Sequence, residues 1–269
     1  MKTKIIFFGN GTLADFALRE LKNCSNLEII FHAKSKDDLD RVKILKQENP
    51  AALGVLASFG VLIKEDLLSL FEPLGILNIH PSLLPKYRGA SPIESAILAG
   101  DTDFSVSVMK LVKKMDAGPV FYQKTFKNLP LEKSKIYEQL ATAGTAWIIE
   151  NLPALKSLKS LSDYHNLIIQ DDSRATFTKK FEKRDGFLTP ETDPADLTLR
   201  KIIAFQDFPK PKLTLFGKTC IILSAEKTSA NKQGSLSIRC ADNQWLKILR
   251  LQPESRKPMD AKSFLNGIR

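Results

Sequence analysis

The sequence predicts an α/β fold, in which a mostly parallel sheet covered by helices on both faces is followed by a small β-barrel. In the first half of the chain, short apolar runs alternate with segments whose apolar residues recur at helical spacing. Such alternation is typical of parallel strands joined by crossover helices. After Pro153 the apolar runs become shorter, and several short strands at close spacing indicate a barrel.

In the first half, we expect a buried strand wherever a short apolar run stands between polar turns. These runs are Ile5–Phe8, Leu27–Phe31, Leu53–Ala57, Ile76–Ile79, Phe104–Leu111 and Val120–Phe126. Apolar residues three or four positions apart predict the helices between and after them. The predicted helices are Ala14–Asn23, Asp37–Gln47, Glu65–Phe71, Pro92–Ala99 and Lys133–Leu152, with Asp37 as the cap of the second.

The second half begins after a segment without a clear period, residues 153–173, which we interpret as a connector. From Arg174 onward a helix is predicted over Asp196–Phe205. Turn residues separate four short predicted strands, which are Leu213–Phe216, Thr219–Leu223, Ser235–Cys240 and Trp245–Leu249. The predicted domains are therefore residues 1–152 and 174–269, joined by residues 153–173.

The composition excludes several classes of protein. Hydrophobic residues make up 43% of the chain, enough for a sizeable core, and no apolar run reaches the roughly 20 residues that span a bilayer. The apolar run near the start leads into Gly9-Asn10-Gly11 and not into a small-residue cleavage site, so no signal peptide is expected. Cys24, Cys220 and Cys240 are too far apart for a disulfide framework or a zinc site. We therefore expect a cytoplasmic protein with reduced thiols.

The positive charge is concentrated in the last third of the chain. Residues 1–173 hold 21 Lys and Arg against 20 Asp and Glu, whereas residues 174–269 hold 19 against 10. Such asymmetry indicates a polyanionic partner, although a solubilising surface would have the same composition.

Two polar residues stand at the end of a predicted strand. Asn78 and His80 are two positions apart, so their side chains share a face at the carboxyl end of the strand, where open α/β sheets place their sites. An Asn amide can stabilise the oxyanion of a tetrahedral intermediate, and a His can exchange a proton with an attacking amine. The pair therefore indicates acyl transfer to an amine. A hydrogen-bonded structural histidine is the alternative reading.

Asp116 stands in the turn Lys113–Pro119, which follows another predicted strand. Its carboxylate could orient His80 or accept a proton through a water. Taken alone, an Asp shortly before a Gly is most often only a turn residue.

The order and spacing of these residues resemble the signature of the folate-dependent formyltransferases, as in Asn78-Ile-His80-Pro-Ser82-Leu-Leu-Pro85, Arg88-Gly89 and Met115-Asp116-Ala-Gly118. The resemblance implies a Rossmann-like formyltransferase fold, 10-formyltetrahydrofolate as the formyl donor, and no metal. It implies a catalytic set of Asn78, His80 and Asp116.

The same resemblance assigns binding residues. In the family the loop after this strand contacts tetrahydrofolate, which implies Ser82, Leu83, Leu84 and Pro85 here. The stretch Ala57–Ile63 resembles the segment that lines the pterin pocket, which implies Phe59, Gly60 and Leu62. The resemblance also implies substrate contacts for Gly11 and Thr12, in a stretch similar to the family's N-terminal signature, and for Arg88.

The second half indicates the acceptor. Ala204-Phe205 with Pro209, Asn231–Gly234 and Leu249–Gly267 resemble the C-terminal domain of the methionyl-tRNA formyltransferase family. This resemblance implies that residues 174–269 form an OB-like tRNA-binding domain. It also implies a monomer that formylates the α-amine of charged initiator methionyl-tRNA for translation initiation. The positive charge of these residues agrees with binding to a phosphate backbone.

One departure and three alternatives stand beside this interpretation. The family usually carries a long basic loop between the second and third strands, which enters the acceptor arm of the tRNA. Here the sequence after Phe31 runs almost directly into a helix. The alternatives are formylation of another amine such as an amino sugar nucleotide, or hydrolysis of the formyl-folate; a non-catalytic RNA-binding protein; and a nicotinamide-dependent oxidoreductase. The turn Gly9–Ala14 loosely fits a dinucleotide fingerprint, but no acidic residue ends the second strand.

Overall fold

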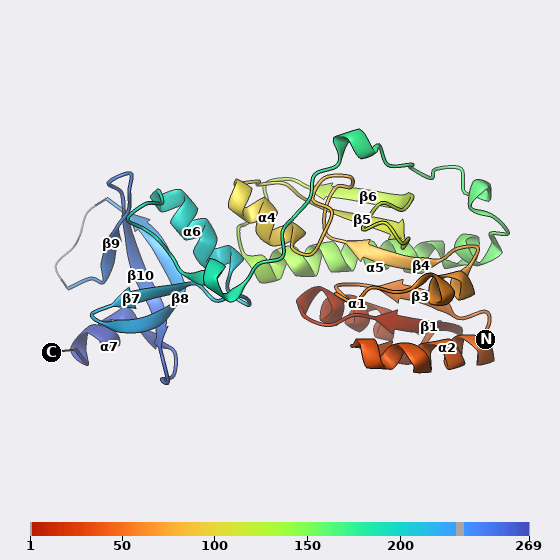
Figure 1. The fold of residues 1–269 in the computed structure, drawn as a ribbon, viewed down its shortest axis with the longest axis horizontal. Helices are drawn as coiled ribbons and strands as arrows, with labels where there is room; N and C mark the ends of the chain where they lie inside the picture. Colours follow the sequence, from red (N-terminus) through yellow and green to blue (C-terminus); the bar gives the residue numbers. More distant parts are fainter. Residues whose placement is uncertain (1, 230–233, 269) are drawn as a thin grey trace. The chain divides into compact units, whose positions relative to one another are not determined.

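A computed structural model describes residues 2–229 and 234–268 of the chain, which divide into two compact units (Figure 1). The first unit comprises Met1–Pro92 and Thr102–Lys179, and the second comprises Ile93–Asp101 and Lys180–Arg269. Of the resemblance in the second half, the part on Asn231, Lys232 and Gln233 lies outside the described residues.

The first unit is built on a six-stranded sheet in the order β2-β1-β3-β4-β5-β6. The neighbours from β2 to β4 pair in parallel, whereas β5 runs antiparallel to β4 and β6 antiparallel to β5. The prediction of a mostly parallel sheet is therefore confirmed. The strands are β1 (Thr3–Phe8), β2 (Leu27–Ala33), β3 (Leu53–Leu56), β4 (Ile76–His80), β5 (Phe104–Lys110) and β6 (Val120–Phe126).

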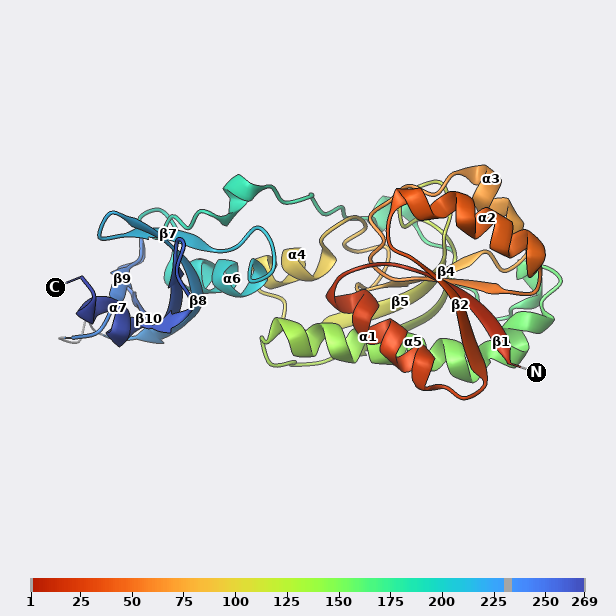
Figure 2. The same cartoon turned by 90° about the horizontal axis from the view of Figure 1, so that it is seen from below.

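Helices cover both faces of this sheet (Figure 2). One face packs against α1 (Thr12–Asn23) and α5 (Lys133–Ser157), and the other against α2 (Leu39–Glu48) and α3 (Glu65–Leu68). The side chains of Ile5–Phe8 in β1 point alternately to the two faces and are all buried, which explains why this part of the strand is an unbroken apolar run. The short helix α4 (Pro92–Ala99) follows the loop after β4.

Among the helix boundaries that differ from the predictions, two have a physical cause in the structure. Asp38 holds the turn before α2, and the predicted cap, Asp37, is wrong. The Asp38 carboxylate accepts the backbone N–H groups of Lys34 at 2.7 Å and Ser35 at 2.9 Å, in the short helix η1 (Lys36–Asp38). Helix α5 continues past Pro153 because Leu155 of its last turn is 1% exposed, and this burial outweighs the single hydrogen bond that a proline removes.

The second unit contains a five-stranded antiparallel sheet in the order β11-β10-β8-β7, with β9 paired to β10. Register shifts around Arg250 bend β10 against β8, so the sheet curls as predicted for a small barrel. Helix α6 packs against β8 and β10. The elements are α6 (Ala195–Ala204), β7 (Lys212–Leu215), β8 (Lys218–Thr228), β9 (Ser237–Arg239), β10 (Trp245–Pro253), β11 (Met259–Asp260) and α7 (Ala261–Asn266).

Residues 158–179, which contain most of the predicted connector, belong to the first unit. They include the short helices η3 (Leu161–Asp163) and η4 (Asp172–Arg174). Ile168 pairs with Val120 at the start of β6, and Phe177 pairs with Arg88 in the loop after β4. No helix within the described residues combines the length and the apolar character needed to cross a membrane.

Candidate functional site

Three polar side chains meet at the carboxyl end of β4. Asn78 and His80 belong to this strand, and each is 5% exposed. Asp116 comes from the turn after β5, where its backbone takes the left-handed conformation with φ of 47°. Its carboxylate lies 3.5 Å from the amide nitrogen of Asn78 and 3.8 Å from Nδ1 of His80. The structure therefore places the three predicted catalytic side chains within reach of one another.

Two backbone groups of the loop after β4 orient this cluster. Nε2 of His80 lies 3.0 Å from the carbonyl oxygen of Tyr87, which can only accept, so Nε2 donates and Nδ1 faces Asp116. The backbone N–H of Gly89 donates to Asp116 Oδ2 at 2.7 Å. The separation of 3.8 Å is too long for a direct hydrogen bond between His80 and Asp116, and it allows a proton to pass between them through a water.

Two side chains of neighbouring strands hold the predicted folate loop. Ser107 of β5 donates to the carbonyl of Ser82 at 2.6 Å and accepts the backbone N–H of Leu84 at 3.2 Å. Gln123 of β6 donates to Ser107 at 3.0 Å and to the carbonyl of Leu84 at 2.8 Å. Leu84 is 4% exposed, whereas Leu83 is 44% exposed. Pro85 is half-buried, so Leu83 is the most exposed of these four residues.

The second predicted folate segment divides in the same way. The Phe59 ring is buried and meets Phe8 edge to face, with ring centroids 5.6 Å apart. Gly60 turns the chain with φ of 67°, and Leu62 is then 75% exposed. This segment follows β3, so it lies at the same sheet edge as the end of β4.

Gly11 and Thr12 stand where β1 leads into α1, at that same edge. Gly11 caps the helix with φ of 80°. A Cβ at Gly9 would lie 2.0 Å from the carbonyl oxygen of Ala57, so close packing against the neighbouring strand requires this glycine. Backbone geometry thus accounts for the glycines that loosely fitted a dinucleotide fingerprint.

Arg88 is fully buried, although arginine is usually exposed. Its guanidinium donates to Gln170 through Nε and Nη2 and to Asp172 through Nη1 at 2.7 Å. The Lys114 ammonium also pairs with Asp172. Hydrogen bonds from the two cations lower the pKa of the Asp172 carboxyl, and Lys114 has the larger effect. The substrate contact of Arg88 stays a prediction. Gln170 was not predicted as a site residue, because it lies in the predicted connector, which has no clear periodicity and no motif.

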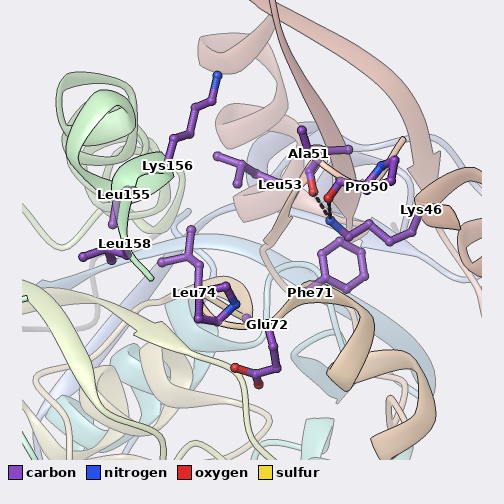
Figure 3. Close-up of a pocket in the computed structure, with 13 residues that line it drawn as sticks. Lys46, Pro50, Ala51, Leu53, Phe71, Glu72, Leu74, Leu155, Lys156 and Leu158 are labelled. Carbon is purple, nitrogen blue, oxygen red and sulfur yellow. Dashed lines mark hydrogen bonds between the residues drawn. The ribbon is translucent and has the colours of Figure 1, made fainter. Parts of the chain in front are cut away.

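A separate hollow of about 160 Å³ lies at the amino ends of β3 and β4, opposite to the end that carries the cluster. Figure 3 shows the side chains that line it. The Lys46 ammonium on its wall donates to the carbonyls of Pro50 and Ala52 and lies 4.9 Å from the centroid of the Phe71 ring. Burial lowers the pKa of Lys46. Because backbone carbonyls engage its ammonium, Lys46 is a structural residue of this wall. Within the described residues, no group of His, Cys, Asp and Glu could hold a metal ion.

Both parts of the chain match known families. Residues 4–152 match the family described as formyl transferase, and residues 180–269 match the formyl transferase C-terminal domain. The chain is 32% identical over 255 residues to methionyl-tRNA formyltransferase of Anaplasma marginale, an alignment that covers 91% of this chain and 79% of that protein.

Solved structures share the fold at low sequence identity. HypX from Aquifex aeolicus, determined in complex with tetrahydrofolic acid, superposes with a TM-score of 0.75 at 17% identity. That match covers 98% of this chain and 46% of HypX, so the chain spans about half the length of that protein. Methionyl-tRNA formyltransferase from Clostridium thermocellum superposes with a TM-score of 0.63 at 16% identity, and the match covers 97% of this chain and 100% of that one.

Proposed function

This chain belongs to the formyl transferase family, and from that premise we infer that it transfers the formyl group of 10-formyltetrahydrofolate to the α-amine of methionyl-tRNA. The observation that carries this proposal is the meeting of Asn78, His80 and Asp116 at the carboxyl end of β4, within the residues that match the family. The acceptor is supported by the relatives named methionyl-tRNA formyltransferase, which the chain matches over about four fifths of their length.

The proposed reaction is an acyl transfer. The amine nitrogen attacks the formyl carbon, and negative charge develops on the formyl oxygen. The Asn78 amide donates a hydrogen bond to this oxyanion, a contribution that is typically worth about 10²–10³ in rate. Because Nε2 of His80 is engaged by the Tyr87 carbonyl, the amine proton passes to the His80–Asp116 pair on the Nδ1 side. The proton returns to N10 of tetrahydrofolate as its bond to the formyl carbon breaks.

We place the folate against the exposed side chains of the two loops at this sheet edge. Leu83 and Leu62 expose apolar surface there, and buried Leu84 and Phe59 support the backbone behind them. Ser82, Pro85 and Gly60 shape the same two loops. We propose that Gly11 and Thr12, where β1 leads into α1, contact the substrate from the neighbouring strand.

The tRNA is proposed to bind through residues 174–269. Their 19 Lys and Arg against 10 Asp and Glu supply the charge that attracts backbone phosphates. Raising the salt concentration should therefore weaken tRNA binding steeply, and an affinity independent of salt would contradict this assignment. We propose a monomer, because one chain supplies all three proposed catalytic side chains. The three widely separated cysteines support the proposal that the protein is cytoplasmic.

The decisive assay measures formyl transfer from 10-formyltetrahydrofolate. Initiator methionyl-tRNA, elongator methionyl-tRNA, free methionine and an amino sugar nucleotide are offered in parallel. The proposal expects formyl-methionyl-tRNA as the main product. It also expects His80→Ala to lower kcat by about 10²–10⁴ with little change in folate KM. His165→Ala, at an exposed position of the connector, is the matched control and should retain wild-type rates. Equal rates in both variants would refute the role of His80, and transfer only to the sugar would refute the acceptor.

The same assay measures how the acceptor is selected. Only Lys34 and Ser35 separate β2 from η1, so a long loop is absent from this described connection. Selection of the initiator over the elongator would then have to come from other surfaces. Equal formylation of both tRNAs would show that the short connection relaxes discrimination.

A further inference from the structure

We propose that Gln170, together with Arg88, is a positioning residue that sets the backbone of the turn carrying Asp116. The Gln170 carboxamide donates to the carbonyl of Asp116 at 2.8 Å and to the carbonyl of Gly118 at 2.7 Å. Its oxygen accepts from Arg88 Nε at 3.1 Å and from Nη2 at 2.8 Å. Both hydrogens and both acceptor positions of the amide are therefore used. This inference rests on the catalytic role proposed for Asp116.

The turn needs such support because of its backbone. Asp116 has φ of 47°, in the left-handed region that residues other than glycine rarely occupy. The Gln170 hydrogen bonds to the carbonyls of Asp116 and Gly118 favour this conformation over the others that an unsupported turn could adopt. The carboxylate is fixed separately, since the N–H of Gly89 donates to its Oδ2 at 2.7 Å.

Arg88 connects these two attachments. Its side chain holds Gln170, and its neighbour Gly89 holds the Asp116 carboxylate. The backbone of Arg88 is itself tied to residues after the connector: its N–H donates to the carbonyl of Thr176, and its carbonyl accepts the N–H of Thr178, each at 2.8 Å. Asp116 is therefore held through its main chain and its side chain by one closed network.

The chemistry of the network requires an amide at position 170. The side chain has to donate toward the Asp116 turn and accept from the buried Arg88 at the same time. Gln170→Glu keeps the acceptor for Arg88 but places carboxylate oxygens against the carbonyls of Asp116 and Gly118, which repel them. Gln170→Leu removes both sets of bonds and leaves the buried guanidinium with Asp172 as its remaining side-chain partner.

Gln170 comes from a part of the chain that the family matches leave out. The first match ends at residue 152 and the second begins at residue 180, so Gln170 lies between them. Its contacts reach back 54 residues to Asp116 and 82 residues to Arg88. Residues 153–173 thus supply a group of the site and do more than join two domains.

The test compares Gln170→Glu with Asn151→Asp. The Asn151 side chain also donates to a backbone carbonyl, that of Trp147 at 2.8 Å within α5, so both variants exchange an amide donor for a carboxylate. We measure kcat and folate KM for formyl transfer, the thermal midpoint, and the ¹⁵N shifts of the His80 ring, one of three histidines in the chain. The ring shifts report which nitrogen carries the proton. Because the ring shifts are measured without a formyl acceptor, they test the role of Gln170 even if methionyl-tRNA is not the substrate.

A displaced Asp116 should lower kcat of Gln170→Glu by about 10–100-fold, since a shift of roughly 1 Å in a reacting group can cost about 100-fold. Folate KM should change far less, and the His80 ring shifts should move. Asn151→Asp should lower the thermal midpoint but leave kcat and the ring shifts unchanged. If Gln170→Glu does not fold, Gln170→Met is measured in its place, because it removes the hydrogen bonds of the amide without adding charge. Wild-type kcat and unchanged ring shifts in a folded variant would overturn the proposal.

Discussion

Replacing Asp116 with asparagine removes one negative charge and changes few atoms. The Asp116 carboxylate accepts the N–H of Gly89 at 2.7 Å through Oδ2 and faces the Asn78 amide nitrogen at 3.5 Å through Oδ1. In Asp116→Asn the new carbonyl oxygen should keep the bond to Gly89, because the opposite orientation would bring two donors to 2.7 Å. The new NH₂ group then faces the NH₂ of Asn78, and Asn78 has to turn its amide over.

The expected magnitudes differ for stability and for rate. A hydrogen bond to a charged group contributes about 1.5–3 kcal/mol and one to a neutral group about 0.5–1.5 kcal/mol, so the weakened Gly89 bond costs about 1 kcal/mol of unfolding free energy. The rate should fall by a factor of about 10²–10⁴, because the variant lacks the proposed proton carrier beside His80. The misdirected Asn78 donor should lower the rate further. At 1.36 kcal/mol for each factor of ten, the barrier rises by at least about 3 kcal/mol.

Single-turnover formyl transfer and urea unfolding give the two quantities on the same protein. Asp103→Asn is the matched control, because Asp103 also accepts a backbone N–H, that of Asn128 at 3.0 Å, at an exposed position outside the cluster. Both variants should lose similar stability, and only Asp116→Asn should lose rate. A loss of less than about tenfold in the single-turnover rate of Asp116→Asn would refute the assigned role of the carboxylate.

Three further predictions concern other parts of the chain. Ser107→Ala should raise folate KM and lower the free energy of unfolding by about 1–3 kcal/mol, because the groups bonded to this buried hydroxyl lose their partner. Titration with folate measures KM and urea unfolding measures stability; an unchanged KM would contradict this prediction. Lys46→Met should cost about 1–3 kcal/mol in urea unfolding with kcat unchanged, because two backbone carbonyls lose their donor far from the cluster. Burial raises the pKa of the Cys220 and Cys240 thiols, so a smaller fraction of them is present as the reactive thiolate. Mass spectrometry should therefore find that iodoacetamide labels half-buried Cys24 first. Earlier labelling of a buried thiol would contradict this.

The sequence predicted those parts of the fold that depend on periodic burial. Strand β6 was predicted with the bounds that the structure has, Val120–Phe126, and the strands of the parallel region differ from the predictions by one or two residues. The elements β11 and α7 were missed because they contain two and six residues, too few for a periodic pattern. The end of α5 was predicted too early because Pro153 indicates a helix boundary and tertiary packing of Leu155 does not show in local sequence.

The candidate site was only partly readable for a different reason. Asn78 and His80 are neighbours on one strand, so their shared face follows from the alternation of side chains. The contact of Gln170 with Asp116 joins an irregular segment to a distant turn, and no local pattern encodes such a pairing. The burial of Arg88 was unexpected, because its environment is assembled from residues more than 80 positions later in the chain.

The network around Arg88 has a consequence for any attempt to transplant the catalytic half into another protein. A fragment cut at residue 152, where the first family match ends, would contain Asn78, His80 and Asp116 but not Gln170 or the Thr176–Thr178 stretch that brackets Arg88. Such a fragment would keep every proposed reacting group and lose the contacts that are proposed to position one of them. During synthesis the same dependence means that the cluster can reach its final geometry only after Thr178 has left the ribosome. The smallest portable version of this half therefore extends through Thr178.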